Sequence, residues 1–268
     1  MSDTVTTALP RLTPSSVADL ECALKYKTLR IDRNWGSNNR DFGAAIAHGT
    51  AVHDVLRRVV RPGGKYEADL EHVEALARQA VYRGRYPAGT DRDGATEKVL
   101  STVRAYVASD DDLAYTISVE RPEEFDYWHN AAPLFRVSVK IDRILVRPES
   151  PTTLVIRDYK LTARPKISLP EAFLYLWAAK KAFGSQGYDE FLFEYDFIDP
   201  DNRVTREVVS GHDVRGQHPL IVEAAVRVIR ADEWPACVGE ACIYCPLRGT
   251  ETCPALPAEH MIDGQDVF

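Results

Sequence analysis

The sequence has no long apolar run, few cysteines and no excess of the residues that mark fibrous or disordered chains. None of its 268 residues lies in a stretch approaching the roughly 18 to 20 apolar residues that span a bilayer. Sixteen prolines and fifteen glycines are too few for a fibrous or disordered chain. The start, MSDTVTTALPRL, lacks the basic and apolar regions of a secretory signal. We therefore expect a cytoplasmic globular protein with reduced thiols and no membrane association.

Positive charge is in deficit, with 33 Lys and Arg against 40 Asp and Glu and a net charge of −7. This deficit weakly disfavours a nucleic-acid partner, because phosphate neutralisation needs Lys and Arg. It is also uneven: the first 110 residues hold 16 basic and 14 acidic side chains, and the remainder holds 17 and 26. A site that collects divalent metal ions must itself be acidic, so the charge leaves a metal-dependent nuclease open.

The five cysteines form an odd set, which argues against a disulfide framework in a chain without a secretory signal. Cys242 and Cys245 have two residues between them in the pattern C-x-x-C, and Cys253 follows closely. One loop can present these three thiolates to one centre, with Cys237 or Cys22 as the fourth ligand. The alternative is a set of scattered buried thiols. The spacing favours a metal or cluster site.

Apolar periodicity predicts helices in the first 110 residues and mostly strands after them. A helix begins near Thr13, a loop spans 34–42, and helices follow over 43–60, 67–83 and 94–109. Strands are predicted over 114–120, 134–146 and 153–159, then a helix over 169–183 that starts with Pro170 and ends before Gly184. A hairpin over 190–198 and 203–209 and a helix over 214–231 complete the order. This order predicts one α/β domain with a mixed sheet flanked by helices.

The stretch KIDRILVRPESPTTLVIRDYK holds the residues most suited to catalysis. Asp158 and Lys160 lie two apart on a predicted strand, so their side chains share a face. If the two strands pair as a hairpin, Asp142 lies close to Asp158, and a hard cation between them would relieve their repulsion. Lys160 would then face the polarised water or the charge that develops on a phosphate. The alternative is a solvated strand face with an Asp–Lys ion pair.

The chain resembles the PD-(D/E)xK nuclease superfamily, in particular its RecB-like branch with an iron–sulfur cluster. This branch includes AddB-type helicase–nucleases and CRISPR-associated adaptation exonucleases. The similar segments follow the family's order over nearly the whole chain: SSVADLECALKYKTLRI, HGTAVHDVL, KIDRI, IRDYKLT and PEAFLYLWA. Each segment is short, and their combined order is what makes the resemblance specific.

The resemblance implies a restriction-endonuclease-like core and a role for each matching residue. His53, Asp142 and Asp158 would hold Mg²⁺ or Mn²⁺, with the carbonyl region around Tyr159 nearby, and Lys160 would be the catalytic lysine. Tyr175 matches the tyrosine of the Q-x-x-x-Y helix, and Gly49 matches the glycine of G-x-x-x-H, where it would allow another backbone to approach closely. The cluster would be 4Fe-4S, bound by Cys22, Cys242, Cys245 and Cys253. Residues 1–12 would be a flexible N-terminus before a single nuclease domain over 13–268, divided into a helical region (13–110), a catalytic sheet core (111–210) and a helix with the iron–sulfur loop (211–268).

Several residues depart from the family pattern. Lys140 stands where the family has Gly, so it would crowd the site or reach DNA. Glu171 stands where the family has Gln, which puts a carboxylate near the metal. Ala23 replaces the Pro after the first cysteine, and Cys237 is a surplus cysteine that we interpret as structural.

Other candidates rest on less support. Glu120 closes a predicted strand and is an accessory acid candidate, whereas His48 has no motif behind it. Without the G-x-x-x-H motif, we would interpret His53 as a core histidine. Basic and aromatic residues of the N-terminal half could form a single-strand path with stacking, or could simply be exposed: Arg30, Arg33, Arg40, Arg57, Arg58, Arg61, Arg83, Arg85, Trp35, Tyr82 and Tyr86.

The expected activity is metal-dependent hydrolysis of DNA phosphodiester bonds by an exonuclease acting on single-stranded DNA or duplex ends. One rival is a catalytically weakened DNA-binding or assembly factor on the same fold, which Lys140 and Glu171 favour. Another is a nuclease with zinc in place of the cluster. Repair, recombination, phage replication and CRISPR adaptation all remain open as pathways, as do the polarity of digestion and the oligomeric state.

Overall fold

A computed structural model describes residues 9–33, 40–63, 70–162, 165–231 and 233–237, together with residues 242, 245, 247 and 250–253. The helices of eight or more residues are α3 (Arg40–Val59), α4 (Leu70–Arg83), α5 (Arg92–Ser109), α6 (Leu169–Phe183) and α7 (Gln217–Ile229). The strands are β1 (Arg11–Leu12), β2 (Thr116–His129), β3 (Ala132–Leu145), β4 (Thr153–Leu161), β5 (Glu190–Ile198) and β6 (Val204–Ser210). Short turns of helix, α1 (Pro14–Val17) and α2 (Ala23–Tyr26) among them, form the N-terminal segment.

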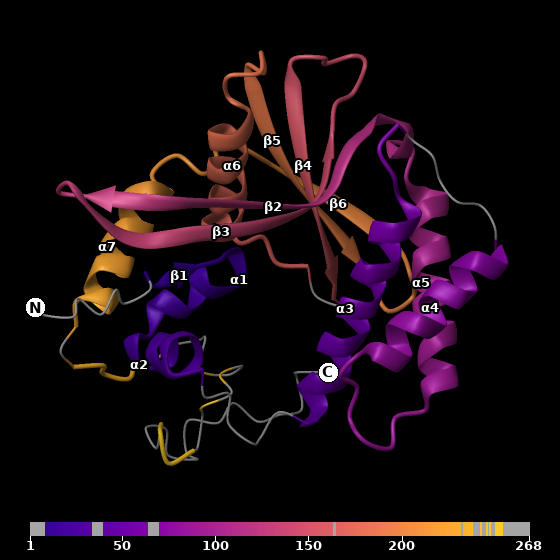
Figure 1. Cartoon of the computed structure of the whole chain (residues 1–268), viewed down its shortest axis with the longest axis horizontal. Helices are drawn as coiled ribbons and strands as arrows, with labels where there is room; N and C mark the ends of the chain where they lie inside the picture. The colour runs from indigo at the N-terminus through magenta and orange to yellow at the C-terminus, as the bar shows by residue number, and fades with distance from the viewer. Residues whose placement is uncertain are drawn as a thin grey trace, which may run out of the picture.

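The strands form one mixed sheet in the order β1-β3-β4-β5-β6, and β2 pairs with β3 as a long antiparallel hairpin (Figure 1). β3 and β4 are antiparallel, β4 and β5 are parallel, and β5 and β6 form a second antiparallel hairpin. The parallel pair is joined by α6, as a crossover connection requires. This mixed sheet flanked by helices is the predicted restriction-endonuclease-like α/β fold, which is therefore confirmed.

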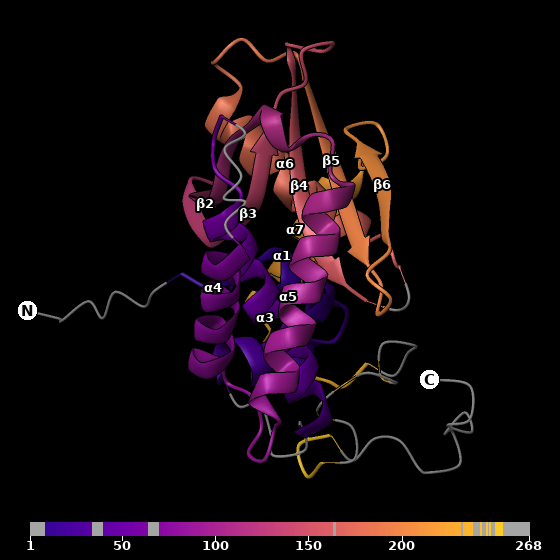
Figure 2. The same ribbon diagram turned by 90° about the vertical axis from the view of Figure 1, so that its right-hand side faces the viewer.

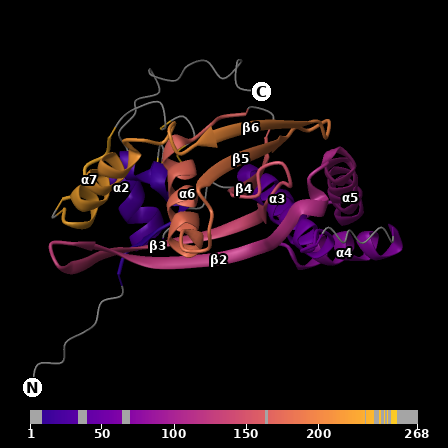
Figure 3. The ribbon, with the colours of Figure 1, turned by 90° about the horizontal axis from the view of Figure 1, so that it is seen from above.

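Two apolar cores lie against the sheet. On one side, α6, α7 and the N-terminal segment pack on Leu154, Ile156 and Phe193. On the other, α3, α4 and α5 bury their own valines and leucines together with Tyr159 and Ile198. Figure 2 shows these three helices beside one another. Seen from above, α6 lies between the β2–β3 hairpin and β5, while α3 to α5 stand at the opposite end (Figure 3). Alternate residues of β4 therefore face different helix layers.

Most element predictions are confirmed, α6 and β5 with the same bounds. The pairing of β3 with β4 and the hairpin around 199–202 are also confirmed. The predicted loop over 34–42 is wrong at its end, because α3 begins at Arg40; residues 34–39 lie outside the described part of the chain, as does Trp35. The strand predicted over 114–120 is too short, since β2 continues to His129 along β3.

The N-terminal segment differs most from its prediction. Arg11 and Leu12, assigned to a flexible N-terminus, pair in parallel with β3, and Leu12 is buried. The helix predicted from Thr13 is broken at Cys22, whose backbone is extended between a 3₁₀ turn and α2. The Cys22 sulfur accepts hydrogen bonds from the backbone N–H groups of Lys25 and Cys237, at 3.5 and 3.4 Å. A contact with the C-terminal region thus overrides the local helical pattern.

No helix within the described ranges combines the length and the apolar character needed to cross a membrane.

Candidate active site

The site lies where β3 and β4 separate. Their ladder pairs Arg143–Leu145 with Arg157–Val155 and goes no further. Asp142 and Asp158 are the next residues on the two strands, so they stand opposite each other at the point of divergence. Strands that part at this point leave room for side chains and a ligand between them.

The Asp142 carboxylate joins the two strands to α3. Its Oδ2 accepts a hydrogen bond from the Tyr159 backbone N–H at 3.0 Å, and its Oδ1 lies 3.2 Å from His53 Nδ1. The other ring nitrogen of His53, Nε2, lies 3.0 Å from the Tyr159 carbonyl oxygen. α3 holds this ring in place because Val52 and Leu56, one on each side of His53 in the sequence, are fully buried in the helical core.

Glu120 completes a group of three possible metal ligands. It falls between the β2–β3 pairs Val119–Arg143 and Arg121–Ile141, so it stands opposite Asp142. His53, Glu120 and Asp142 each offer one ligand atom, and these atoms all lie within 4.8 Å of one another. Glu120 also has a left-handed backbone with φ of 51°. Such strain in a residue that is not glycine is typical of functional sites.

Asp158 and Lys160 lie next to this group and share a face of β4. Lys160 Nζ lies 2.9 Å from Asp158 Oδ2 and 2.8 Å from Glu171 Oε1. The Tyr175 hydroxyl donates a hydrogen bond of 2.7 Å to Asp158 Oδ1. Glu171 Oε2 in turn accepts from the Tyr195 hydroxyl at 3.2 Å. Two residues of α6 and one of β5 therefore fix the acid and the amine of the D-x-K motif.

The carboxylates dominate the electrostatics of the site. Burial lowers the pKa of His53, but Asp142, Asp158 and Glu120 outweigh it and raise that pKa to about 9. For Asp158, burial acts in the opposite direction, and the pKa is raised to about 7. Asp142 and Glu171 also raise this pKa, whereas Lys160 lowers it. The pKa of Lys160 is raised, because Asp158 and Glu171 outweigh its burial. The negative field that favours a proton on His53 also attracts a metal cation.

An open pocket of about 730 Å³ gives access to the site. Its wall holds His53, Glu120, Asp142 and Asp158, and its rim includes Arg57, Arg83 and Lys140. A second pocket of about 390 Å³ is lined by Lys160 together with His53 and Asp158. A polyanion could thus approach the acids past basic side chains.

A sequence model of the PD-(D/E)XK nuclease superfamily matches residues 11–254. The chain belongs to this superfamily. Among solved structures, a protein from Eubacterium rectale named "Putative exonuclease" matches with a TM-score of 0.55 at 10% identity, over 88% of each chain. The crystal structure of SSO0001 matches with a TM-score of 0.44 at 11% identity, over 96% of this chain and 91% of its own. No curated protein sequence matches the chain.

The donor set fits the divalent metal that PD-(D/E)XK nucleases use. Glu120 Oε2 and Asp158 Oδ2 are buried, and each has a lysine ammonium beside it, Lys140 for Glu120 and Lys160 for Asp158. An ammonium uses one lone pair of a carboxylate oxygen, so a second lone pair of each oxygen is available to a cation. The carboxylates suit Mg²⁺ and Mn²⁺, and the imidazole adds a preference for a transition metal.

The cysteines lie near one another at the N-terminal segment. Besides the Cys237 N–H bond to Cys22, the Cys242 thiol donates to the Cys237 carbonyl oxygen at 3.5 Å. The Cys245 N–H donates to the Cys242 carbonyl oxygen at 3.2 Å. Burial raises the pKa of the Cys245 thiol, and Cys242 and Cys253 are near enough to add to this effect. Cysteines more than 200 residues apart in the sequence therefore share one region. Most residues between Cys242 and Cys253 fall outside the described part of the chain.

Some expectations about individual residues need correction or addition. The close backbone approach expected at Gly49 is wrong, since a Cβ there would meet nothing within 4 Å; Gly49 instead lines both pockets.

Lys140 does not fill the site: its side chain is 64% exposed at the rim and pairs with Glu120. Sequence reasoning missed Tyr195, which the alternation of β5 could have placed on the same face as Phe193 and Phe197. Of the N-terminal arginines, Arg30 pairs with Asp19, and Arg57 and Arg58 pair with Asp54.

Proposed function

We propose that this chain is a divalent-metal-dependent deoxyribonuclease of the RecB-like branch that degrades DNA from its ends. The observation that carries the proposal is the convergence of His53, Glu120 and Asp142, within 4.8 Å of one another, beside the buried Asp158–Lys160 pair. The choice of an exonuclease rests on the motif resemblance, and the name given to the structural neighbour from Eubacterium rectale agrees with it.

The residues have distinct roles in this proposal. His53, Asp142 and Asp158 hold Mg²⁺ or Mn²⁺, and Glu120 is a further ligand. A bound divalent ion lowers the pKa of a water and offsets charge on the phosphate. Lys160, kept protonated by Asp158 and Glu171, donates hydrogen bonds to the phosphate as its negative charge grows. Tyr175 holds one Asp158 oxygen by a hydrogen bond, so that the cation shares the other oxygen with Lys160.

We further propose that Cys22, Cys242, Cys245 and Cys253 bind a 4Fe-4S cluster. Cys22 lies beside the C-terminal cysteines, since the Cys237 N–H donates to the Cys22 sulfur and the Cys242 thiol donates to the Cys237 carbonyl oxygen. The motif resemblance is what favours iron–sulfur over zinc at this place. Backbone N–H groups that donate to Cys22 are also typical of cluster ligands.

The deciding experiment is digestion of end-labelled linear DNA, single- and double-stranded, in Mg²⁺ or Mn²⁺. Asp158→Asn and Lys160→Met should each reduce the cleavage rate by at least 1,000-fold while the circular dichroism spectrum and the urea midpoint stay near those of the native chain. Asp201→Asn, at an exposed turn, is the matched control and should cleave normally.

The alternative is a DNA-binding or assembly factor without catalysis, which the Lys140–Glu120 ion pair favours because it occupies a candidate ligand. Tight DNA binding without cleavage in either metal would support that alternative and would contradict the nuclease. Cleavage that survives in either Asp158→Asn or Lys160→Met would contradict the proposed mechanism.

A further inference from the structure

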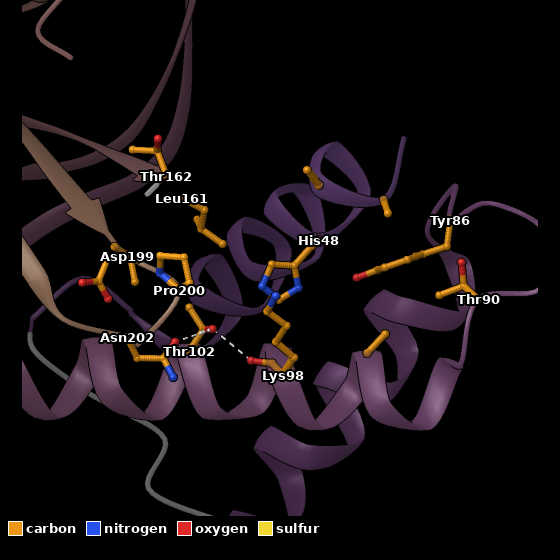
Figure 4. A pocket seen from close by; sticks show the side chains of 14 residues that line it. His48, Tyr86, Thr90, Lys98, Thr102, Leu161, Thr162, Asp199, Pro200 and Asn202 are labelled. Atoms are coloured by element: carbon orange, nitrogen blue, oxygen red, sulfur yellow. Dashed lines mark hydrogen bonds between the residues drawn. The ribbon is translucent and has the colours of Figure 1, made fainter. Parts of the chain in front are cut away.

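A pocket of about 490 Å³ lies beyond the catalytic end of β4, between α3, α5 and the turn after β5 (Figure 4). Its volume is in the usual range for small-ligand sites. Leu161 and Thr162, which directly follow Lys160, line both this pocket and the smaller one that contains His53, Asp158 and Lys160. The two pockets therefore share a wall made by the end of the catalytic strand.

Tyr86 provides a buried polar group without a partner. Its side chain extends toward His48 in Figure 4, and the residue is only 9% exposed. Its hydroxyl oxygen is buried and makes no hydrogen bond with the described residues. Buried hydroxyls are normally paired, so an unpaired one facing a pocket indicates a ligand.

Two groups pack against the Tyr86 ring. The Arg92 guanidinium lies over it, with its central carbon 5.0 Å from the ring centroid. A Cβ on Gly84 would lie 3.1 Å from the ring edge, a tight contact that glycine avoids. Burial raises the pKa of the hydroxyl, which therefore stays protonated and able to donate.

His48 and Lys98 supply the other polar groups. Burial, with help from Lys98, lowers the pKa of His48 to about 4, so the ring is neutral at pH 7, with one donor and one acceptor nitrogen. Lys98 is exposed at the rim of the pocket. By contrast, the Thr102 hydroxyl is already bonded to Asn202 Oδ1 at 2.8 Å and to the Lys98 carbonyl oxygen. The groups available to a ligand gather around His48.

These groups match a flat heteroaromatic ligand that carries a negative charge. Leu161 and Pro200 offer apolar contact, Tyr86 and neutral His48 offer donors and acceptors, and Lys98 offers a cation. A nucleobase has a flat face and a polar edge, and its phosphate is the matching anion. From Lys160 to Thr162 the strand rises about 7 Å, so the pocket adjoins the place where Lys160 would meet the scissile phosphate.

We propose that this pocket binds the base of a nucleotide one or two steps from the scissile phosphate, with Tyr86 and His48 on its polar edge and Lys98 on the adjoining phosphate. This role rests on the proposed nuclease function, because it takes DNA as the ligand. The pocket would fix the end of the strand relative to Lys160, so that cleavage occurs a set distance from that end.

Direct binding tests the pocket without requiring cleavage. Calorimetry with 2′-deoxyadenosine 5′-monophosphate, 2′-deoxyadenosine and inorganic phosphate separates base from phosphate recognition. We expect the monophosphate to bind most tightly, Tyr86→Phe to weaken both base-containing probes about fivefold, and Lys98→Ala to weaken the two phosphate-containing probes but not 2′-deoxyadenosine. Tyr188→Phe is the matched control, because Tyr188 lies just before the start of β5, whereas the pocket lies at the end of that strand. Equal affinity for phosphate and monophosphate, or unchanged affinity in Tyr86→Phe, would overturn the proposal.

The second measurement uses single-stranded oligonucleotides with one abasic position at each of the four terminal nucleotides. In the native chain one position should raise KM about tenfold with little change in kcat, and Tyr86→Phe should reduce that penalty. A penalty that is the same at all positions would overturn the proposal. If no oligonucleotide is cleaved, the nuclease function fails, and calorimetry still decides whether the pocket binds the base.

Discussion

Glu120 shows most clearly how a single residue reveals the site. It has a left-handed backbone, a buried oxygen beside the Lys140 ammonium and a place opposite Asp142. A long acidic side chain would not remain in this conformation on packing grounds alone, because the conformation costs about 1–2 kcal/mol. The sequence offered Glu120 only as an accessory acid, yet the structure puts it in the same group as His53 and Asp142.

Replacing Glu120 tests its role as a metal ligand. Glu120→Gln keeps the shape but removes a negative charge from the site, and metal affinity depends on the number of charged ligands. We expect the Mn²⁺ concentration for half-maximal DNA cleavage to rise on the order of tenfold, with an unchanged urea midpoint. Glu207→Gln on β6 is the control. A variant that matches this control at every metal concentration would exclude Glu120 as a ligand.

Among the elements, the β2–β3 hairpin carries two candidate ligands, and its turn is strained. Asn130 and Ala131 both have positive φ, 50° and 63°. A two-residue turn of this kind favours glycine at the second position.

Ala131→Gly should therefore stabilise the protein. Relief of the left-handed strain exceeds the entropy that glycine adds to the unfolded chain, for a net gain of about 0.5–1 kcal/mol. The measurement is the free energy of unfolding in urea. Ala132→Gly, one residue later in β3, is the matched control and should lose stability, because its φ is not in the left-handed range. A loss in both variants would show that the turn is not strained.

A buried ion network ties α5 to the central strands. Arg143 and Arg157 are fully buried and pair with Asp110, and Arg157 also pairs with Asp112 and Glu194. Burial alone would raise the pKa values of Asp110 and Asp112, but the arginines outweigh it and hold both values below the usual range. This network fixes the strand that continues into Asp158 and Lys160.

Stability should therefore fall in acid. Because the folded pKa values of Asp110 and Asp112 are depressed, their contribution is complete above the unfolded pKa of about 3.9 and is lost as the pH drops through the folded values. Asp110→Asn leaves the arginine charges poorly compensated and should cost about 3–5 kcal/mol at pH 7. Urea unfolding from pH 7 to pH 2.5 measures both effects. A variant with the full acid dependence of the native chain would remove Asp110 from the explanation.

At the scale of the whole molecule, the cysteines connect the two ends of the chain. Cys22 and Cys237 are in contact although 215 residues separate them. A cluster at this place would close nearly the entire chain and restrict the unfolded state.

Cys22→Ser should lose iron, lose absorbance near about 400 nm and unfold at a lower temperature than the native chain. Cys237→Ser is the matched control, and it should keep its iron because we propose Cys237 as a structural cysteine. Iron content after anaerobic purification and the melting temperature are the measurements. Iron retained in Cys22→Ser but lost in Cys237→Ser would exchange the roles of the two cysteines.

The sequence by itself determined the features that depend on local pattern. The bounds of α6 follow from Pro170 at its start and Gly184 after its end, and the shared face of Asp158 and Lys160 follows from strand geometry. The order of the motifs along the chain is that of the superfamily. These features depend on residues close together in the chain, where spacing alone fixes direction.

The tertiary structure decided the rest. Glu120 lies close to His53 and Asp142. Glu171 pairs with Lys160 and is itself held by Tyr195. The backbone is extended at Cys22, where the sulfur accepts a hydrogen bond from the Cys237 N–H. Tyr86 and Leu161 meet in one pocket from helical and sheet regions. These contacts depend on how two helix layers pack on a sheet that opens between β3 and β4. Spacing along the chain carries no information about partners brought together by folding, so the full site emerges only once the chain is packed.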